Sequence, residues 1–96
     1  MKKGYWVVAY RAIHDESALK EYGKLALPAL EASGGKILIR TAEAHAHEAG
    51  LNQRVVVTEF ESLEKALAAH ETPAYQAALK VLGSAVERDL RIVEGV

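Results

Sequence analysis

The four histidines of this chain are the first side chains to consider for chemistry. His45 and His47 lie two positions apart, so in an extended segment both imidazoles would point to one face and could bind the same metal ion. A metal site needs a third and a fourth ligand, and nothing in the sequence identifies them. A polar loop with two solvated histidines explains the pattern more simply, and we predict no metal site.

His70 and His14 are candidates for ligand contact or proton transfer. His70 lies seven residues after Leu63 and so shares the apolar face of the helix predicted there, where it could act as a general base beside a pocket. It could equally cap the C-terminus of that helix, because cations are favoured there. His14 precedes the first predicted helix, in a loop of the kind that forms the mouth of a barrel.

Arg40 and Glu59 form a second candidate set, because they fall in strands that should be hairpin neighbours. If both point away from the helices, they line a pocket or form an ion pair within an interface. A carboxylate buried there would have a perturbed pKa and could abstract a proton. The expected antiparallel register puts Lys36 opposite Glu59, and alternation alone does not decide which residues face the helices.

Tyr22 and Tyr75 lie on the apolar faces of two predicted helices. Each hydroxyl needs a partner when it is buried, which either core packing or a ligand contact would supply. With these two tyrosines the candidate ligand-binding residues are Arg40, Glu59, His70, Tyr75, His14 and Tyr22. We assign no catalytic residue.

The segments that must position these residues alternate between strand and helix patterns. Runs rich in β-branched and aromatic residues predict strands at 4–11, 36–41, 53–60 and 89–94. Together with two helical regions, they give the order βαββαβ. This order predicts one α+β, ferredoxin-like domain over residues 1–96, a four-stranded antiparallel sheet with helices on one face.

Two helical regions connect these strands. The first is predicted over 18–33 as one helix, with Pro28 on its polar side, where water can satisfy the carbonyl group that the proline leaves free. The second is predicted over 63–71, with a break and a restart at Thr72-Pro73, since Pro is favoured at the first position of a helix. Apolar spacing carries this restarted helix on to Val86.

The predicted sheet has apolar residues on both faces of strands 4–11 and 53–60. Helices would cover one face only, and the other would be an apolar patch large enough to need a partner. Packing two sheets face to face in a two-fold dimer covers it. The sequence therefore predicts a homodimer, a dimeric α/β barrel.

Composition argues against several classes of function. The chain has 96 residues and a formal net charge of -1, without a basic run, which argues against a nucleic-acid partner. It has no cysteine, hence no disulfide and no thiolate nucleophile. No apolar run approaches the ~20 residues of a membrane span, and no nucleotide-binding glycine motif occurs. We expect a cytoplasmic protein with no cofactor and no membrane partner.

Five segments of the chain resemble, in order, the domain of unknown function 1330 family: GYWVVAY, GGKILIR, VVVTEFESLEKA, TPAYQAAL and DLRIVEGV. The resemblance spans nearly the whole chain and is carried by the combination of EF-x-S-x-E-x-A, P-x-YQ-A and the terminal IVEGV. It implies a ferredoxin-like fold and a dimeric α/β barrel, and little about activity. Antibiotic-biosynthesis-type monooxygenases, haem-degrading enzymes and EthD-like proteins share this architecture by fold-level analogy.

The chain both follows and departs from that family's pattern. The matching residues are Arg40, Glu59, Phe60, Pro73, Tyr75 and Glu94. Ala69-His70 replaces an aromatic pair, Leu82 replaces an arginine, and Thr41-Ala42 replaces a Gly-Gly. A ligand shared with other members of the family does not follow from the resemblance.

Three hypotheses about function remain open. The first is a small-molecule-binding dimer with a pocket between sheet and helices, lined by Arg40, Glu59, His70 and Tyr75. The second is a cofactor-independent enzyme of the monooxygenase or isomerase kind, with a pocket His or Glu as base. The third is a dimer without a small-molecule site. We favour the first, because convergent polar groups on apolar faces indicate a pocket more than a reaction.

Overall fold

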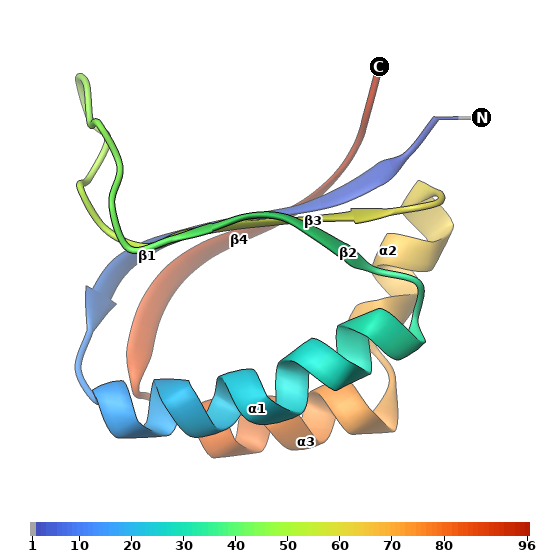
Figure 1. The fold of residues 1–96 in the computed structure, drawn as a ribbon, viewed down its shortest axis with the longest axis horizontal. Helices are drawn as coiled ribbons and strands as arrows, with labels where there is room; N and C mark the ends of the chain where they lie inside the picture. The colour runs from blue at the N-terminus through green and yellow to red at the C-terminus, as the bar shows by residue number, and fades with distance from the viewer. Residues whose placement is uncertain (1) are drawn as a thin grey trace.

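The computed structural model describes residues 2–96 as a sheet packed over a layer of helices (Figure 1). The elements are, in order, β1 (Gly4–Ile13), α1 (Glu16–Ala32), β2 (Lys36–Thr41), β3 (Val55–Phe60), α2 (Leu63–His70), α3 (Pro73–Leu82) and β4 (Val86–Glu94). The strands lie in the order β2-β3-β1-β4, and every neighbouring pair is antiparallel. This confirms the predicted ferredoxin-like fold.

The register of β1 decides which residues face the helices, the question that alternation had left open. Trp6, Val8 and Tyr10 face the helices and are buried. Tyr5 and Val7 lie on the opposite face of the sheet, which no helix or strand within residues 2–96 covers (Figure 1). We call this second face the open face.

Several element boundaries differ from the sequence prediction: β1 runs to Ile13 rather than to residue 11, and α1 spans Glu16–Ala32 rather than 18–33. β3 begins at Val55, two residues later than expected. β4 begins at Val86, and α3 ends earlier than predicted, at Leu82. Gly83 ends α3 in a backbone conformation with a φ of 51°, which favours glycine. Val86 then pairs with the end of β1, which runs on to Ile13, so its helical spacing from Leu82 has no structural meaning.

Local capping fixes the helix starts, at the predicted positions for α2 and α3 and two residues before the predicted start for α1. The side chain of Asp15 accepts a hydrogen bond from the N–H of Ala18, at 3.1 Å. The hydroxyls of Ser62 and Thr72 cap α2 and α3 in the same way. Pro28 lies exposed within one uninterrupted α1, as expected.

An aromatic core joins the sheet to α2 and α3. The rings of Trp6 and Tyr75 meet edge to face with centroids 4.9 Å apart, and the Trp6 indole N–H donates to the carbonyl of Ala66 at 2.8 Å. Gly4 lets β1 approach the start of α2, since a Cβ there would lie 2.7 Å from the Cα of Leu63. α2 thus packs directly on the sheet, whereas α1 packs mainly on α3.

No helix within residues 2–96 is both long enough and apolar enough to cross a membrane.

Candidate functional site

A cavity of about 530 Å³ lies between α1 and the helix-facing side of the sheet. This volume is in the range of small-molecule sites, about 300–1,000 Å³. Its apolar lining includes Val8, Leu19, Ala26, Leu30, Ile37 and Val56. Gly23 also lines it, and a Cβ added at Gly23 would meet no atom within 4 Å. The space exists because α1 rests on α3 and carries small residues toward the sheet.

Basic side chains line one end of this cavity. Tyr10 of β1 pairs with Arg88 of β4, and its backbone N–H donates to the carbonyl of Arg54 at 2.9 Å. Arg54 immediately precedes β3, so these three residues form a row across the helix-facing side of the sheet. Arg40 of β2, which pairs with Val56, also lines the cavity.

A bulge in β2 turns Arg40 into the cavity. Lys36 pairs with Glu59 and Ile37 with Thr58, but the next pair joins Ile39 to Val57, so Leu38 is an extra residue. An extra residue exchanges the two faces for everything that follows it in the strand. Arg40 therefore lies on the helix-facing side, although strict alternation would place it on the face of Lys36.

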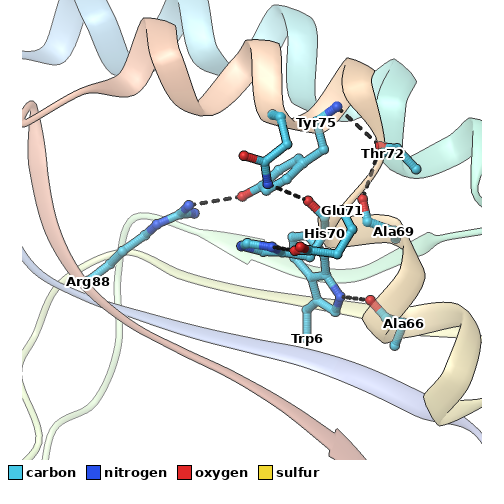
Figure 2. A network of polar contacts seen from close by, with 9 residues as sticks. Trp6, Ala66, Ala69, His70, Glu71, Thr72, Tyr75 and Arg88 are labelled. Atoms are coloured by element: carbon cyan, nitrogen blue, oxygen red, sulfur yellow. Dashed lines mark hydrogen bonds and ion pairs between the residues drawn. The ribbon is translucent and has the colours of Figure 1, made fainter.

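Arg88 binds two tyrosine hydroxyls at the edge of the cavity. Its Nη1 donates to Tyr22 Oη at 3.1 Å and its Nη2 to Tyr75 Oη at 2.9 Å, the latter drawn in Figure 2. The two hydroxyls also share a hydrogen bond of 2.7 Å. Burial raises the pKa of Tyr22 well above 10, against the opposing effect of Arg88, so this phenol stays protonated.

Arg54 differs from Arg88 in its hydrogen bonding. Its Nε is buried and has no hydrogen-bond partner among the residues that the structure describes. A buried donor without a partner costs about 1–3 kcal/mol. Because Arg54 lines the cavity, a ligand there could supply the missing acceptor.

His70 and Tyr75 lie together at the junction of α2 and α3 (Figure 2). The His70 ring packs against Trp6 and Tyr75, with centroid distances of 5.8 and 5.3 Å. Its Nδ1 lies 2.6 Å from a carboxylate oxygen of Glu71. Neither His70 nor Tyr75 is among the lining residues of the cavity. The Tyr75 hydroxyl does contact that of Tyr22, which lines the cavity.

Arg40 and Glu59, grouped in the sequence analysis, lie on opposite faces of the sheet. Glu59 lies on the open face and accepts a hydrogen bond of 2.9 Å from the Tyr5 hydroxyl, which raises the pKa of Tyr5. Lys36, not Arg40, pairs with Glu59, as the expected register required. A single pocket that joins Arg40 to Glu59, His70 and Tyr75 is therefore not formed, and this expectation is corrected.

The remaining histidines lie outside the cavity lining. His14 Nε2 lies 2.9 Å from a carboxylate oxygen of Glu87, and both side chains are exposed. His45 and His47 are exposed in the loop between β2 and β3. Over positions 2–96, no group of three or more His, Asp or Glu side chains is placed to hold a metal ion.

Sequence reasoning missed Tyr10, Arg54 and Arg88 as site residues. One signal was available: the side of β1 that carries Trp6 and Tyr10 is the bulkier one, as expected for a side packed against helices. The positions of Arg88 and Arg54 on either side of Tyr10 would then follow from the register of the strands. That register joins strands distant in sequence: Tyr10 and Arg88 continue the regular pairing of Trp6 with Ile92 and Val8 with Leu90.

Comparison with known proteins gives a family and a set of similar folds. Residues 3–96 match the family described as Domain of unknown function (DUF1330). The search of curated proteins found no match. Among solved structures, a protein of unknown function from Rhodopseudomonas palustris has a TM-score of 0.75 and 18% identity, over 99% of this chain and 83% of that chain.

Two further structures extend the comparison. A proposed antibiotic biosynthesis monooxygenase from Nitrosomonas europaea has a TM-score of 0.62 and 18% identity, over 98% of this chain and 98% of that chain. A dimeric ferredoxin-like protein of unknown function from Thermobifida fusca has a TM-score of 0.54 and 13% identity, over 96% of this chain and 90% of that chain. At these identities the likeness concerns the fold alone.

Proposed function

We propose that this chain, which belongs to the domain of unknown function family DUF1330, is a small-molecule-binding protein that acts as a homodimer. One observation carries the proposal: the cavity of about 530 Å³ combines an apolar lining with polar groups that converge at one end. This combination is typical of ligand sites. The chain would act as one ferredoxin-like unit, and its lack of cysteine fits the reducing cytoplasm.

Binding is favoured over proton-transfer chemistry by the side chains at the cavity. Its described lining contains no histidine, and Glu16 is its one carboxylate. Tyr22 keeps its proton near neutral pH because burial raises its pKa, so it can donate a hydrogen bond but cannot act as a base. Of the groups considered earlier as bases, His70 does not line this space and Glu59 lies on the other face.

The open face supports the proposal of a homodimer. Val7 pairs with Val57 there, and Val7, Ile39 and Val93 remain 37%, 47% and 42% exposed in the single chain. Face-to-face packing of two sheets would bury this apolar surface. Since the cavity lies on the opposite side of the sheet, each protomer would keep its own site. The Thermobifida fusca protein of similar fold is dimeric by its own description.

Native mass spectrometry of untagged protein tests the assembly. We expect a dimer mass for the wild type and a monomer mass for Val57→Lys, which puts a charge in the centre of the open face. Leu67→Lys is the matched control, because Leu67 is 48% exposed on α2, away from that face. A monomeric wild type would refute the dimer. If both variants were monomeric, the added charge would dissociate the dimer wherever it is placed, and the open face would not be identified as the interface.

Ligand capture tests the site. We expect a small molecule to dissociate from the wild-type dimer on denaturation, or members of a metabolite library to raise its melting temperature. Gly23→Leu should abolish either signal, because its side chain would occupy the cavity; Ala77→Leu, at an exposed position of α3, should not. If no molecule is captured and none shifts the melting temperature, the alternative of an interface without a small-molecule site is preferred.

A cofactor-independent monooxygenase or isomerase is the second candidate. The fold shared with the Nitrosomonas europaea protein favours it, as does the Tyr22 hydroxyl, a donor at the cavity edge that could polarise a substrate carbonyl. Incubation of any captured ligand with the protein in air, followed by mass spectrometry, separates the two candidates. Gain of oxygen or rearrangement would indicate an enzyme, and unchanged ligand would indicate binding alone.

A further inference from the structure

We infer that the ligand of this cavity is a monocarboxylate with an apolar body, and that Arg54 and Arg40 bind its carboxylate group. The inference rests on the proposed function, since it names the ligand class of the same site. It goes beyond that proposal by assigning an orientation to the ligand and separate roles to the three arginines.

The charge of the cavity favours an anion. Four basic side chains and one acidic side chain line it: Arg40, Arg54, Arg88, Lys20 and Glu16. Glu16 and Lys20 lie one turn apart on the same side of α1, so their charges offset each other at the rim. The remaining positive charge belongs to the arginines that extend from the sheet.

The three arginines are not equivalent. Arg88 already donates from both terminal nitrogens, to Tyr22 and to Tyr75, and therefore acts as a structural and positioning residue. Arg54 has a buried Nε without an acceptor in the described part of the chain. Arg40 pairs with Val56, and Arg54 lies two residues before Val56 on the same face, so Arg40 and Arg54 are diagonal neighbours roughly 7–8 Å apart. Both guanidinium groups can therefore reach one anion.

A carboxylate fits these donors better than a phosphate. The planar guanidinium can bind either anion through two hydrogen bonds, but an apolar cavity disfavours burial of a phosphate dianion more than burial of a singly charged carboxylate. Phosphates in proteins are commonly bound at helix N-termini. At the start of α1 one free backbone N–H group is already bonded, because the Asp15 side chain accepts from the N–H of Ala18, and the Asp15 carboxylate disfavours a second anion there.

The register of the sheet orients the ligand. Arg40 and Arg54 lie at the end of the sheet nearest the start of α1, whereas Trp6 and Ile37 lie toward the other end. α1 runs back along the sheet, so Leu30 near its C-terminal end lines the same far part of the cavity (Figure 1). The carboxylate group would therefore lie near the β2–β3 loop and the apolar body would point toward Trp6.

Calorimetric titration of the wild-type dimer with three probes tests this inference: 3-phenylpropanoate, its neutral amide 3-phenylpropanamide, and phenyl phosphate. We expect the carboxylate to bind most tightly. Arg54→Gln should weaken carboxylate binding by about tenfold to a hundredfold, the scale of one charge-assisted hydrogen-bonded contact, and should leave amide binding unchanged. Arg40→Gln should have the same sign of effect. Lys80→Gln, the same charge change in the exposed last turn of α3, should have none.

The outcomes separate this inference from the proposed function. Equal binding of carboxylate and amide, or tighter binding of phenyl phosphate, would overturn the carboxylate assignment and leave the small-molecule site in place. If no probe binds and no molecule is captured from cells, both fail. Circular dichroism should show that Arg54→Gln folds, and its melting temperature should not fall, because the variant removes an unpaired buried donor. If Arg54→Gln does not fold, weakened carboxylate binding by Arg40→Gln becomes the deciding measurement.

Discussion

The substitution Tyr75→Phe is the most direct test of the polar contacts that position Arg88. The Tyr75 side chain is fully buried, and its hydroxyl contacts Arg88 Nη2 at 2.9 Å and Tyr22 Oη at 2.7 Å. Loss of a hydrogen bond to a charged group costs about 1.5–3 kcal/mol, and loss of a neutral one about 1 kcal/mol. The greater hydrophobicity of Phe offsets part of this sum. We expect the free energy of unfolding to fall by about 2–3 kcal/mol.

Thermal and chemical denaturation at one fixed protein concentration measure the effect, since the proposed dimerisation would make stability depend on concentration. For a domain of this length the expected loss corresponds to a melting temperature lower by roughly 10 °C or more. The slope of the denaturant curve should stay unchanged, because the surface exposed on unfolding is the same.

Tyr22→Phe provides the comparison. It leaves the bond between Tyr75 and Arg88 intact, so it should cost less, about 1–2 kcal/mol. The double variant should cost less than the sum of the single changes, by about 0.5 kcal/mol or more, because the two hydroxyls share one bond and one cation. A Tyr75→Phe protein within about 0.5 kcal/mol of the wild type would refute the reasoning, as would strict additivity.

Three further predictions concern stability. Gly23→Ala should raise the free energy of unfolding by about 0.5–1 kcal/mol, because alanine is the better helix former and its Cβ meets open space; urea denaturation that shows a loss would contradict this. Gly4→Ala should lower it by about 1–3 kcal/mol, because its Cβ collides with the backbone at the start of α2, and an unchanged urea midpoint would show that β1 moves freely. Burial raises the pKa of Tyr22, so above about pH 10 the unfolded chain loses a proton that the folded protein keeps. Stability should therefore be insensitive to this group below pH 9 and fall as the pH rises above about 10, more steeply in the wild type than in Tyr22→Phe; parallel curves would exclude this cause.

The features predictable from sequence are those with local causes. Ser62 and Thr72 cap their helices through hydroxyls that bond three residues ahead, and Pro28 lies on the side of α1 that packing leaves free. The order of strands and helices follows from the same local patterns. The apolar character of both faces of β1 also follows directly from its sequence.

The candidate site was predictable only in part, because it depends on contacts between strands distant in sequence. Tyr22 was identified from the apolar face of its helix, but its partner Arg88 comes from β4, 66 residues further along the chain. Nothing local to Arg54 marks its buried Nε. Glu59 was grouped with Arg40 because their strands were expected to be neighbours in a hairpin, and a single extra residue in β2 puts them on opposite faces.

That extra residue lets one strand present a cation to each side of the sheet. Lys36 and Arg40 are four positions apart, a spacing that regular alternation would put on one face, yet Lys36 pairs with Glu59 on the open face and Arg40 pairs with Val56 on the cavity side. Because Leu38 is the residue without a pairing partner in β2, its deletion would leave both of these pairs in place and would remove a side chain that is 46% exposed. We therefore expect a Leu38 deletion to keep Arg40 at the cavity, whereas the face of Arg40 would change only if β2 slipped by one residue against β3.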